Sequence, residues 1–473
     1  GKEVEDRICQ DFERISQKLE GLPGTEADLA HIELMAGAVD ELDGIITANY
    51  NIETKYRLTP GVSKMVYQPS KLGRIAVAEQ SDWISSGGTA AATTAAAATC
   101  EAEISYPATT QEALSVDSMN GVFRSPRISG GSLSGATFSL TLPIHSWSST
   151  TPSGAPSASN LFPDAIFVKN ALGGVSYNGY APDADTITGG TTSVLTMDGD
   201  DTSVMVPGQA ILVPLGAPAT GHSVGWIQSV DESASPDDVT LTQNLSAAPA
   251  ATGRVYGSIS TFMSSATTVP LTVTWQGNNA NTQIRLEDCV VTSATITATP
   301  KEQPKLTVEL LAKSWTNIGS GGAPGQFAIQ NAQLPALLGN NAARLVVSNT
   351  ATNVSSFEIA ITNEVAEVMS HDSTEGVAQF VTTNRAVTCS FTAPAESLAV
   401  LSPGTARVIQ LDLANVPGQA FSCLIPGAIL QESSSIGDSE GLISESFTYA
   451  AGGYTSDENS ANAGNSLARV AWL

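Results

Sequence analysis

One pentapeptide of this chain has the residue types of a hydrolase nucleophile. Residues 221–225, GHSVG, match the G-x-S-x-G pattern, in which Ser223 would attack a carbonyl carbon. That chemistry needs a strand before the serine, a helix after it and a histidine base within reach. The residues that follow, VGWIQSV, instead alternate as in a strand, and His371 is the only histidine downstream. We therefore expect no catalytic residue, and a hydrolase built on Ser223 is the weakest interpretation of the chain.

The sequence also lacks a set of metal ligands. Residues 197–209, MDGDDTSVMVPGQ, are as acidic as a calcium loop, but Ser203 stands where that loop needs Gly and Gln209 where it needs Glu. The 4 histidines are far apart, and the 5 cysteines include no C-x-x-C pair. No glycine-rich phosphate-binding motif occurs. We expect neither a metal nor a cofactor.

Composition limits the class of partner. The formal net charge is −25, which argues against a protein that grips nucleic acid, because phosphate binding needs clustered Lys and Arg. It leaves open a surface that nucleic acid passes without sticking. A sparse, odd number of cysteines is typical of reduced thiols in a protein made in a cytosol. No run of 18 apolar residues occurs, so we expect no membrane partner.

The most informative feature is an internal repeat. Residues 103–122 match residues 358–377 without a gap, with eight identities in twenty positions. The match continues as TFSLTLP (137–143) with TCSFTAP (388–394), and DCVVTSA (288–294) with SCLIPGA (422–428). A spacing of 255 residues is far longer than a solenoid repeat of roughly 20–50 residues. The chain is therefore predicted to contain two copies of one domain.

Acidic residues recur within this repeat. In AEIS and FEIA, Glu103 and Glu358 each alternate with an isoleucine, so each glutamate is predicted to face away from the core. Glu112 and Glu367 form a second matched pair. One interpretation is an ordinary solvent-exposed face. The functional interpretation is that these four carboxylates line or frame a central channel.

The elements that must position these residues are mainly β-strands. From about residue 51 the chain shows period-two alternation with many Gly, Pro and Asn residues, whereas residues 1–50 carry two helical apolar stripes separated by Pro23-Gly24. We predict a mainly β protein with two tandem homologous β-sandwich units, each with one flanking helix, at 163–172 and 394–404. The predicted divisions are an acidic helical hairpin (1–50), unit 1 (51–174 plus 264–325), an inserted small β-domain (175–263) and unit 2 (335–473).

Three parts of residues 102–473 carry a resemblance to a known family. They are FPDAIFVKNALGG (162–174), WQGNN (275–279) with LEDCVVTSATITATPKEQPKLTVELLAKSW (286–315), and FSCLIPGAILQESSSIGDSEGLISESFTYAAGG (421–453). In strand content and order they resemble the major tail tube proteins of long-tailed bacteriophages. In that family a β-sandwich with one flanking helix forms stacked rings around a lumen that carries DNA. The tandem arrangement is similar to the trimeric tail tubes, in which two fused domains give three subunits a pseudo-sixfold ring. The helical hairpin of residues 1–50 departs from the family pattern.

The resemblance implies a structural, non-enzymatic virion protein that is assembled in the bacterial host cytoplasm. Its expected partners are further copies of itself, the tape measure protein and passing DNA in the lumen, and the tail terminator and tail tip proteins. An acidic inner wall would repel the duplex and let it slide. Two alternatives stay open. One is another virion β-protein: a tail terminator, a baseplate or fibre adaptor, or a capsid decoration protein. The other is a secreted carbohydrate-binding β-sandwich.

Overall fold

The computed structural model describes most of the chain after residue 72, all of it within the compact unit 68–473. The described residues are 73–84, 97–103, 113–115, 127–129, 136–144, 162–173, 175–177, 186–198, 205–216, 221–234, 236–262, 268–277, 283–299, 302–317, 344–352, 354, 356–370, 377–394, 404–433, 437–439, 442–452 and 466–473. The predicted helical hairpin 1–50 lies outside these residues, as does most of the helix expected at 394–404.

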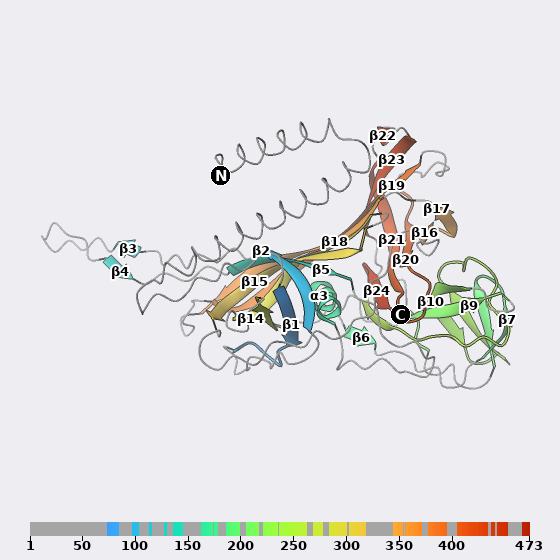
Figure 1. Cartoon of the computed structure of the whole chain (residues 1–473), viewed down its shortest axis with the longest axis horizontal. Helices are drawn as coiled ribbons and strands as arrows, with labels where there is room; N and C mark the ends of the chain where they lie inside the picture. The colour runs from blue at the N-terminus through green and yellow to red at the C-terminus, as the bar shows by residue number, and fades with distance from the viewer. Residues whose placement is uncertain are drawn as a thin grey trace, which may run out of the picture. The chain divides into compact units, whose positions relative to one another are not determined.

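The predicted mainly β architecture is confirmed, the described strands pair antiparallel, and most of them belong to one large sheet (Figure 1). Six of its strands pair in a closed order, β1-β13-β14-β15-β5-β2 and back to β1. We call these six the first strand set. They are β1 (Gly73–Glu79), β2 (Ala97–Glu103), β5 (Ala136–Pro143), β13 (Leu271–Gln276), β14 (Gln283–Ala298) and β15 (Lys305–Asn317).

A second strand set has the same order, β16-β20-β21-β23-β19-β18, with the short strand β17 on the other edge of β16. Its strands are β16 (Arg344–Val347), β17 (Thr350–Thr352), β18 (Ser356–Met369), β19 (Val377–Pro394), β20 (Arg407–Leu413), β21 (Phe421–Ser433) and β23 (Leu442–Ala451). Pro394, expected to begin a helix, is instead the last residue of β19.

The registers of the two sets agree residue by residue. Glu103 pairs with Ser139 in the first set, as Glu358 pairs with Ser390 in the second. The bulges agree as well. A register shift on β14, at residue 292, has its counterpart on β21, at residue 431. We call such matched positions register equivalents.

Register equivalence corrects one detail of the sequence comparison. Leu271 pairs with Cys289 just before a bulge, and Arg407 pairs with Ala428 just before a bulge at the same place. Cys289 is therefore the register equivalent of Ala428, five residues beyond the cysteine with which the sequence match aligned it. Because the bulges fall at the same places in both sets, they do not account for a difference of five residues, and the short match of 288–294 with 422–428 does not join equivalent positions.

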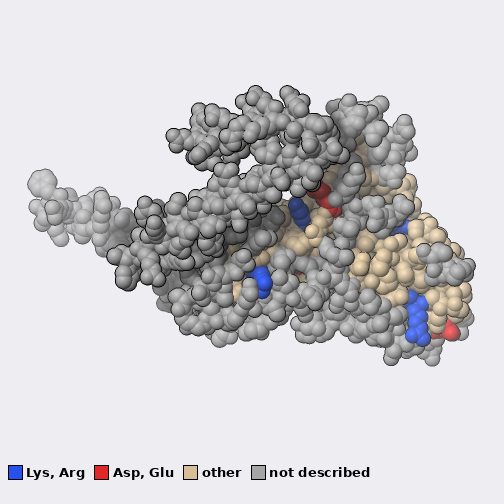
Figure 2. All heavy atoms as spheres, viewed as in Figure 1, with Lys and Arg blue, Asp and Glu red and all other residues tan. Residues whose placement is uncertain are grey.

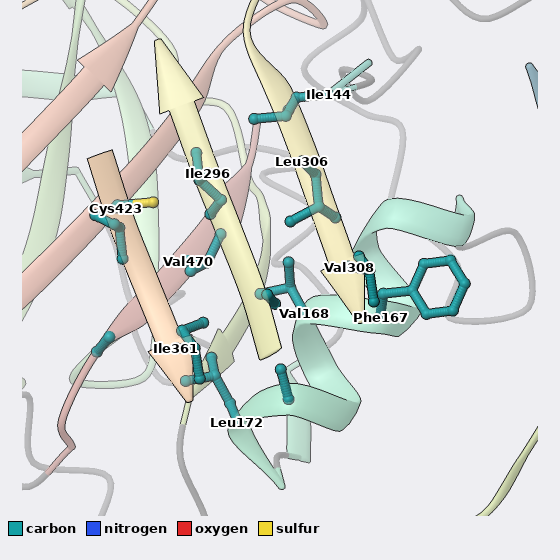
Figure 3. Packing of buried hydrophobic residues seen from close by; sticks show 14 of the residues in the cluster. Ile144, Phe167, Val168, Leu172, Ile296, Leu306, Val308, Ile361, Cys423 and Val470 are labelled. Carbon is teal, nitrogen blue, oxygen red and sulfur yellow. The ribbon is translucent and has the colours of Figure 1, made fainter. Parts of the chain in front are cut away.

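The apolar core lies on the inner face of both sets and is covered by one helix. Helix α3 (Pro163–Leu172) begins with Pro at its first position and Asp164 in its first turn, and ends at Gly173, whose φ is 64°. This confirms the helix predicted at 163–172. Figure 3 shows Leu172 of α3 beside Ile361 of β18, and Val168 close to the strand that carries Ile296. The helix thus packs against strands of both sets.

A smaller sheet, with the strand order β7-β8-β11-β10-β9, has an apolar core of its own (Figure 1). Its strands are β7 (Ile187–Gly190), β8 (Val194–Met197), β9 (Ala210–Leu215), β10 (Gly221–Asp231) and β11 (Asp237–Leu241). It lies inside the predicted insertion 175–263, but the two ends of that segment do not belong to it. Strands β6 (Val175–Tyr177) and β12 (Ile259–Phe262) pair with each other in the main sheet.

The smaller sheet packs firmly against the second strand set. Trp226 of β10 is buried among Ala420, Leu424 and Ala471, and its indole Nε1 donates to Ser422 Oγ at 2.9 Å. The last strand, β24 (Arg469–Trp472), pairs with β21 on one edge and with β12 on the other. The remaining short strands are β3 (Ala113–Ser115), which pairs with β4 (Arg127–Ser129), and β22 (Gly437–Ser439), which pairs with β23.

Candidate functional site

The G-x-S-x-G pentapeptide lies within a strand, as its alternation predicts. Residues 221–225 open β10 and pair along their length with β9, and Ser223 is buried opposite Val213. His222 is the residue before Ser223 on the strand, so its side chain points to the opposite face of the sheet. The His222 ring meets the Tyr256 ring edge-on, with 5.4 Å between centroids, and burial lowers its pKa. His371 lies outside the described residues. Ser223 therefore does not lie on an elbow, and the described residues place no histidine base on its face of the sheet.

The acidic segment 197–209 is described only at its ends. Met197 is buried at the end of β8, and Gln209 is buried with its Oε1 accepting from the backbone N–H of Val206 at 3.4 Å. Within the described ranges, no group of three or more His, Cys, Asp and Glu side chains could hold a metal ion.

Eight strands join the two sets in one continuous run of a sheet. Their order is β2-β5-β15-β14-β18-β19-β23-β21, and β14 pairs directly with β18. The described side chains of one face of these strands are mostly Ser and Thr, in cross-strand contact. The contacts are Thr141–Thr307 at 3.3 Å, Ser390–Thr448 at 3.3 Å and Thr392–Ser446 at 2.9 Å between hydroxyl oxygens. We call this surface the polar sheet face.

Two exposed carboxylates lie on the polar sheet face. Glu358 is exposed, and its strand neighbours are Thr297 of β14 and Ser390 of β19. Glu309 is exposed on β15 between Ser139 and Ser293. No ion pair joins either glutamate to a cation among the residues described. These two carboxylates give the face a negative character at two separate places.

The four predicted channel residues fall in different places. Glu358 alternates with the buried Ile359, which confirms its predicted strand phase. Glu103 ends β2 at the equivalent register, and its side chain is outside the described part of the structure, as is the whole of Glu112. Glu367 is exposed but lies in the opposite phase of β18, paired with the buried Phe380. The structure therefore does not bring Glu358 and Glu367 to one face of the strand.

Sequence reasoning missed Glu309. It lies out of phase with Leu306, Val308 and Leu310, which are all buried, so the alternation in KLTVELL carries the signal. The residue was overlooked because unit 2 has Thr448, not an acid, at the register-equivalent position: Ser139 pairs with Glu309 as Ser390 pairs with Thr448.

The opposite face of β18 and β19 forms a joint with the first strand set. The far part of the β18–β19 hairpin brings Phe380 against Trp83, with ring centroids 5.9 Å apart, and the cluster includes Val290 and Val377. Each of these four side chains is buried. We call this contact the intrachain joint.

Buried hydrogen bonds fix the intrachain joint. The amide nitrogen of Asn363 donates to the carbonyl oxygens of Val291 at 2.8 Å and of Ala171 at 3.0 Å, and its Oδ1 accepts from Arg385 Nε at 2.8 Å. Because unpaired buried polar groups are costly, this network favours one placement of β18 on β14.

A buried ion pair lies at the same joint. Lys313 Nζ is 3.7 Å from Asp288 Oδ2 and donates to the carbonyl oxygen of Ala378 at 3.4 Å. Burial raises the pKa of the Asp288 carboxyl, while the hydrogen bond from the Ile84 amide and the charge of Lys313 act in the opposite direction. The pair ties a β19 backbone group to β14 and β15.

In the view of Figure 2 the described Lys and Arg atoms form small separate patches, some of them beside Asp or Glu atoms. The chain matches no protein-family model and no curated protein sequence. None of the described helices is long and apolar enough to cross a membrane.

Proposed function

We propose that this chain is a structural protein of a bacteriophage virion that polymerises as stacked rings into the tail tube. The observation that carries the proposal is the eight-strand polar sheet face, in which one four-strand pattern occurs twice in tandem. Strands β2, β5, β15 and β14 are followed in the same sheet by their register equivalents β18, β19, β23 and β21. A wall made of repeated, similarly oriented sheet segments is what a ring around a lumen requires.

The repetition supports two tandem homologous units in quasi-equivalent places around one axis. The paired registers, the matched bulges and the sequence repeat between 103–122 and 358–377 all have the same origin in a duplicated domain. We assign unit 1 to residues 51–174 plus 264–325 and unit 2 to residues 335–473, with the segment 175–263 as an insertion in unit 1. Three chains would then supply six units to a pseudo-sixfold ring.

The chemistry of the polar sheet face suits a channel for DNA. Hydroxyl groups carry no charge, and Glu358 and Glu309 repel phosphates, which B-DNA carries at one charge per about 1.7 Å of axis. Lys305 is exposed in the same phase of β15 as Glu309, so the face also carries a cation. With Glu103 at the equivalent register, each ring would present carboxylates from every unit at one height. Glu367, in the opposite phase of β18, would face away from the lumen, and Glu112 stays a candidate to border it. The charge of −25 agrees with a wall on which DNA slides.

This function has no catalytic step and needs no cofactor. The partners would be further copies of the chain, the tape measure protein and then DNA in the lumen, and the tail terminator and tail tip proteins at the two ends. Assembly would take place in the cytoplasm of the bacterial host. Another virion β-protein, such as a terminator, an adaptor or a capsid decoration protein, would not need a duplicated wall segment. A carbohydrate-binding sandwich would gather exposed aromatic rings, whereas aromatic residues make up 6% of this chain.

Electron microscopy of the purified chain in negative stain tests the proposal. We expect rings or tubes with a central hole and threefold symmetry, and two wall segments per chain when the particles are averaged. Compact particles without a hole at all concentrations, or rings with six chains, would contradict it. DNA that fills the tubes at physiological salt and resists elution would contradict the sliding wall.

A further inference from the structure

A buried acid and a buried amine face each other across β14 and β15 in the intrachain joint. Cys289 pairs with Ala312, so Asp288 and Lys313, one position along, are opposed on the two strands. Lys313 Nζ is 3.7 Å from Asp288 Oδ2, and the side chains of Lys313 and Asp288 are 6% and 1% exposed. The amine nitrogen and the carboxyl group are therefore held side by side, away from water.

The backbone at Asp288 is shaped to hold its carboxyl group in this place. Its φ is 54°, in the left-handed region that residues other than glycine rarely adopt. A register shift between β13 and β14, after the pair of Leu271 with Cys289, falls beside it. Bulges and left-handed residues both occur next to functional sites, where they re-aim a side chain at some cost in strain.

Backbone groups fix the acid and the amine separately. The Ile84 N–H donates to Asp288 Oδ1 at 3.1 Å, and Gln80 Oε1 accepts from the Asp288 N–H at 3.1 Å. Lys313 Nζ donates to the carbonyl oxygen of Ala378 at 3.4 Å. One carboxyl oxygen thus has a backbone donor, whereas the other, Oδ2, lies toward the amine.

The surroundings of this pair disfavour charge. The apolar cluster of the joint includes Trp83 and Val377. These two residues directly precede Ile84 and Ala378, whose backbone groups hold the pair. Burial raises the pKa of the Asp288 carboxyl, which favours the uncharged acid. An ion pair enclosed in this way is costly to keep, so a reaction that removes both charges is favoured.

We propose that Asp288 and Lys313 condense to an isopeptide bond, a covalent link between β14 and β15 that the folded chain forms by itself. A proton moves from Lys313 Nζ to the Asp288 carboxylate, which leaves a neutral amine and a neutral acid. The amine nitrogen then attacks the carboxyl carbon, and the Ile84 N–H stabilises the negative charge that develops on Oδ1. The new C–N bond forms, the bond from Cγ to Oδ2 breaks, and Oδ2 leaves as water with two protons that began on Nζ.

The bond would form only after the β18–β19 hairpin has docked, because β19 supplies Ala378 and Phe380 to the joint. It would close a loop that contains the turn between β14 and β15. Covalent links of this kind stabilise a fold by restricting the unfolded chain. The reaction uses neither a ring nor DNA, so the inference stands apart from the proposed function.

Mass spectrometry of the intact chain tests the proposal. The chain is purified after folding and denatured before injection, and it should be lighter than its unmodified sequence by the mass of one water molecule. Lys313→Arg is the matched variant, because a guanidinium keeps its proton and its charge opposite Asp288 but does not condense with the acid. After correction for the substitution, this variant should retain the water. The comparison between the two chains cancels any difference at their ends.

Tryptic digestion locates the bond. We expect one branched peptide that joins the segments containing Asp288 and Lys313, with no cleavage after Lys313. The pair of Lys169 with Glu79 is the internal control. Its Nζ–Oε1 distance is shorter, at 2.8 Å, but its side chains are 19% and 33% exposed, so it should stay unlinked.

Three outcomes would overturn the proposal. The first is a folded chain with the unmodified mass. The second is a loss of water that persists in Lys313→Arg, because a succinimide formed at an aspartate alone gives the same change in mass. The third is a branched peptide that joins Lys169 to Glu79 as well, since the reaction would then not depend on burial.

Discussion

The two strand sets share a pattern of pairing, yet their outer surfaces differ in what covers them. In the first set, β14 and Val290 lie beneath the β18–β19 hairpin, with Phe380, Asn363 and Lys313 completing the contact. In the second set, Ile429 occupies the equivalent place on β21. The difference teaches that the hairpin of the same chain buries Val290 on one strand set, whereas Ile429, its register equivalent on the other set, stays partly exposed.

The largest effect on stability is expected where the β18–β19 hairpin covers the first strand set. Phe380→Ala removes a ring that is 1% exposed and packs against Trp83, so we expect a loss of about 3–5 kcal/mol in the free energy of unfolding, measured by urea denaturation. Val381→Ala, one residue along and 39% exposed, is the matched control and should cost less than about 0.5 kcal/mol. Similar losses in the two variants would show that the hairpin is not anchored through Phe380.

A pair of equivalent substitutions compares the two surfaces directly. Val290→Ala should lower the free energy of unfolding by about 1–2 kcal/mol, because its two methyl groups are buried within the chain. Ile429→Ala should destabilise the dissociated chain less than Val290→Ala does, but should raise the concentration needed for assembly by roughly tenfold, which corresponds to about 1.4 kcal/mol. Light scattering against concentration measures this threshold. An unchanged threshold would count against a covered Ile429 in the assembly.

The dependence of stability on pH sharpens the contrast between buried and exposed acids. Burial raises the pKa of Asp412, despite Arg344 Nε at 3.4 Å, above its ordinary value of 3.8. Its contribution to stability is therefore fully present below that value and is lost as pH rises through the folded pKa. Asp412→Asn should remove this decline from the free energy of unfolding measured between pH 4 and 7.

Asp231 provides the control of opposite sign. Hydrogen bonds from Ser233 lower its pKa, so its contribution is present above the ordinary value of 3.8 and is lost as pH falls. Asp231→Asn should therefore flatten the acid side of the profile and leave the range from pH 5 to 7 unchanged. A decline that persists in the Asp412→Asn variant would assign it to another buried acid, such as Asp288.

The smallest effect on folding is expected on the polar sheet face. The double variant Glu103→Lys with Glu358→Lys should leave assembly intact. Because Glu358 is exposed, its substitution alone should change the free energy of unfolding by less than about 0.5 kcal/mol. Duplex DNA should then bind to assembled tubes at low salt and lose affinity as the salt concentration rises. Ejection of DNA from a tail that carries the variant should be slower. Fluorescence anisotropy of labelled DNA measures the binding. The control, Glu232→Lys, reverses a charge that follows β10 in the smaller sheet, away from this face, and should leave DNA unbound. Equal binding by both variants would argue against a channel wall.

Local patterns in the sequence determined the class of fold and the phase of individual side chains. Alternation placed Glu358 opposite in phase to Ile359 and kept Ser223 in a strand, and Pro163 with Gly173 bounded helix α3. These features depend on residues only a few positions apart, so a linear reading can find them.

Tertiary structure alone decided which strands meet. The junction of β14 with β18, the return of β24 between β21 and β12, and the place of β6 and β12 in the main sheet each join segments far apart in the chain. Alternation specifies the face on which a side chain lies but not the partner of its strand, and a match of a few residues can align positions that the strand register does not. For that reason the repeat was visible in the sequence, whereas Glu309 joined Glu358 on one face only when the strands were paired.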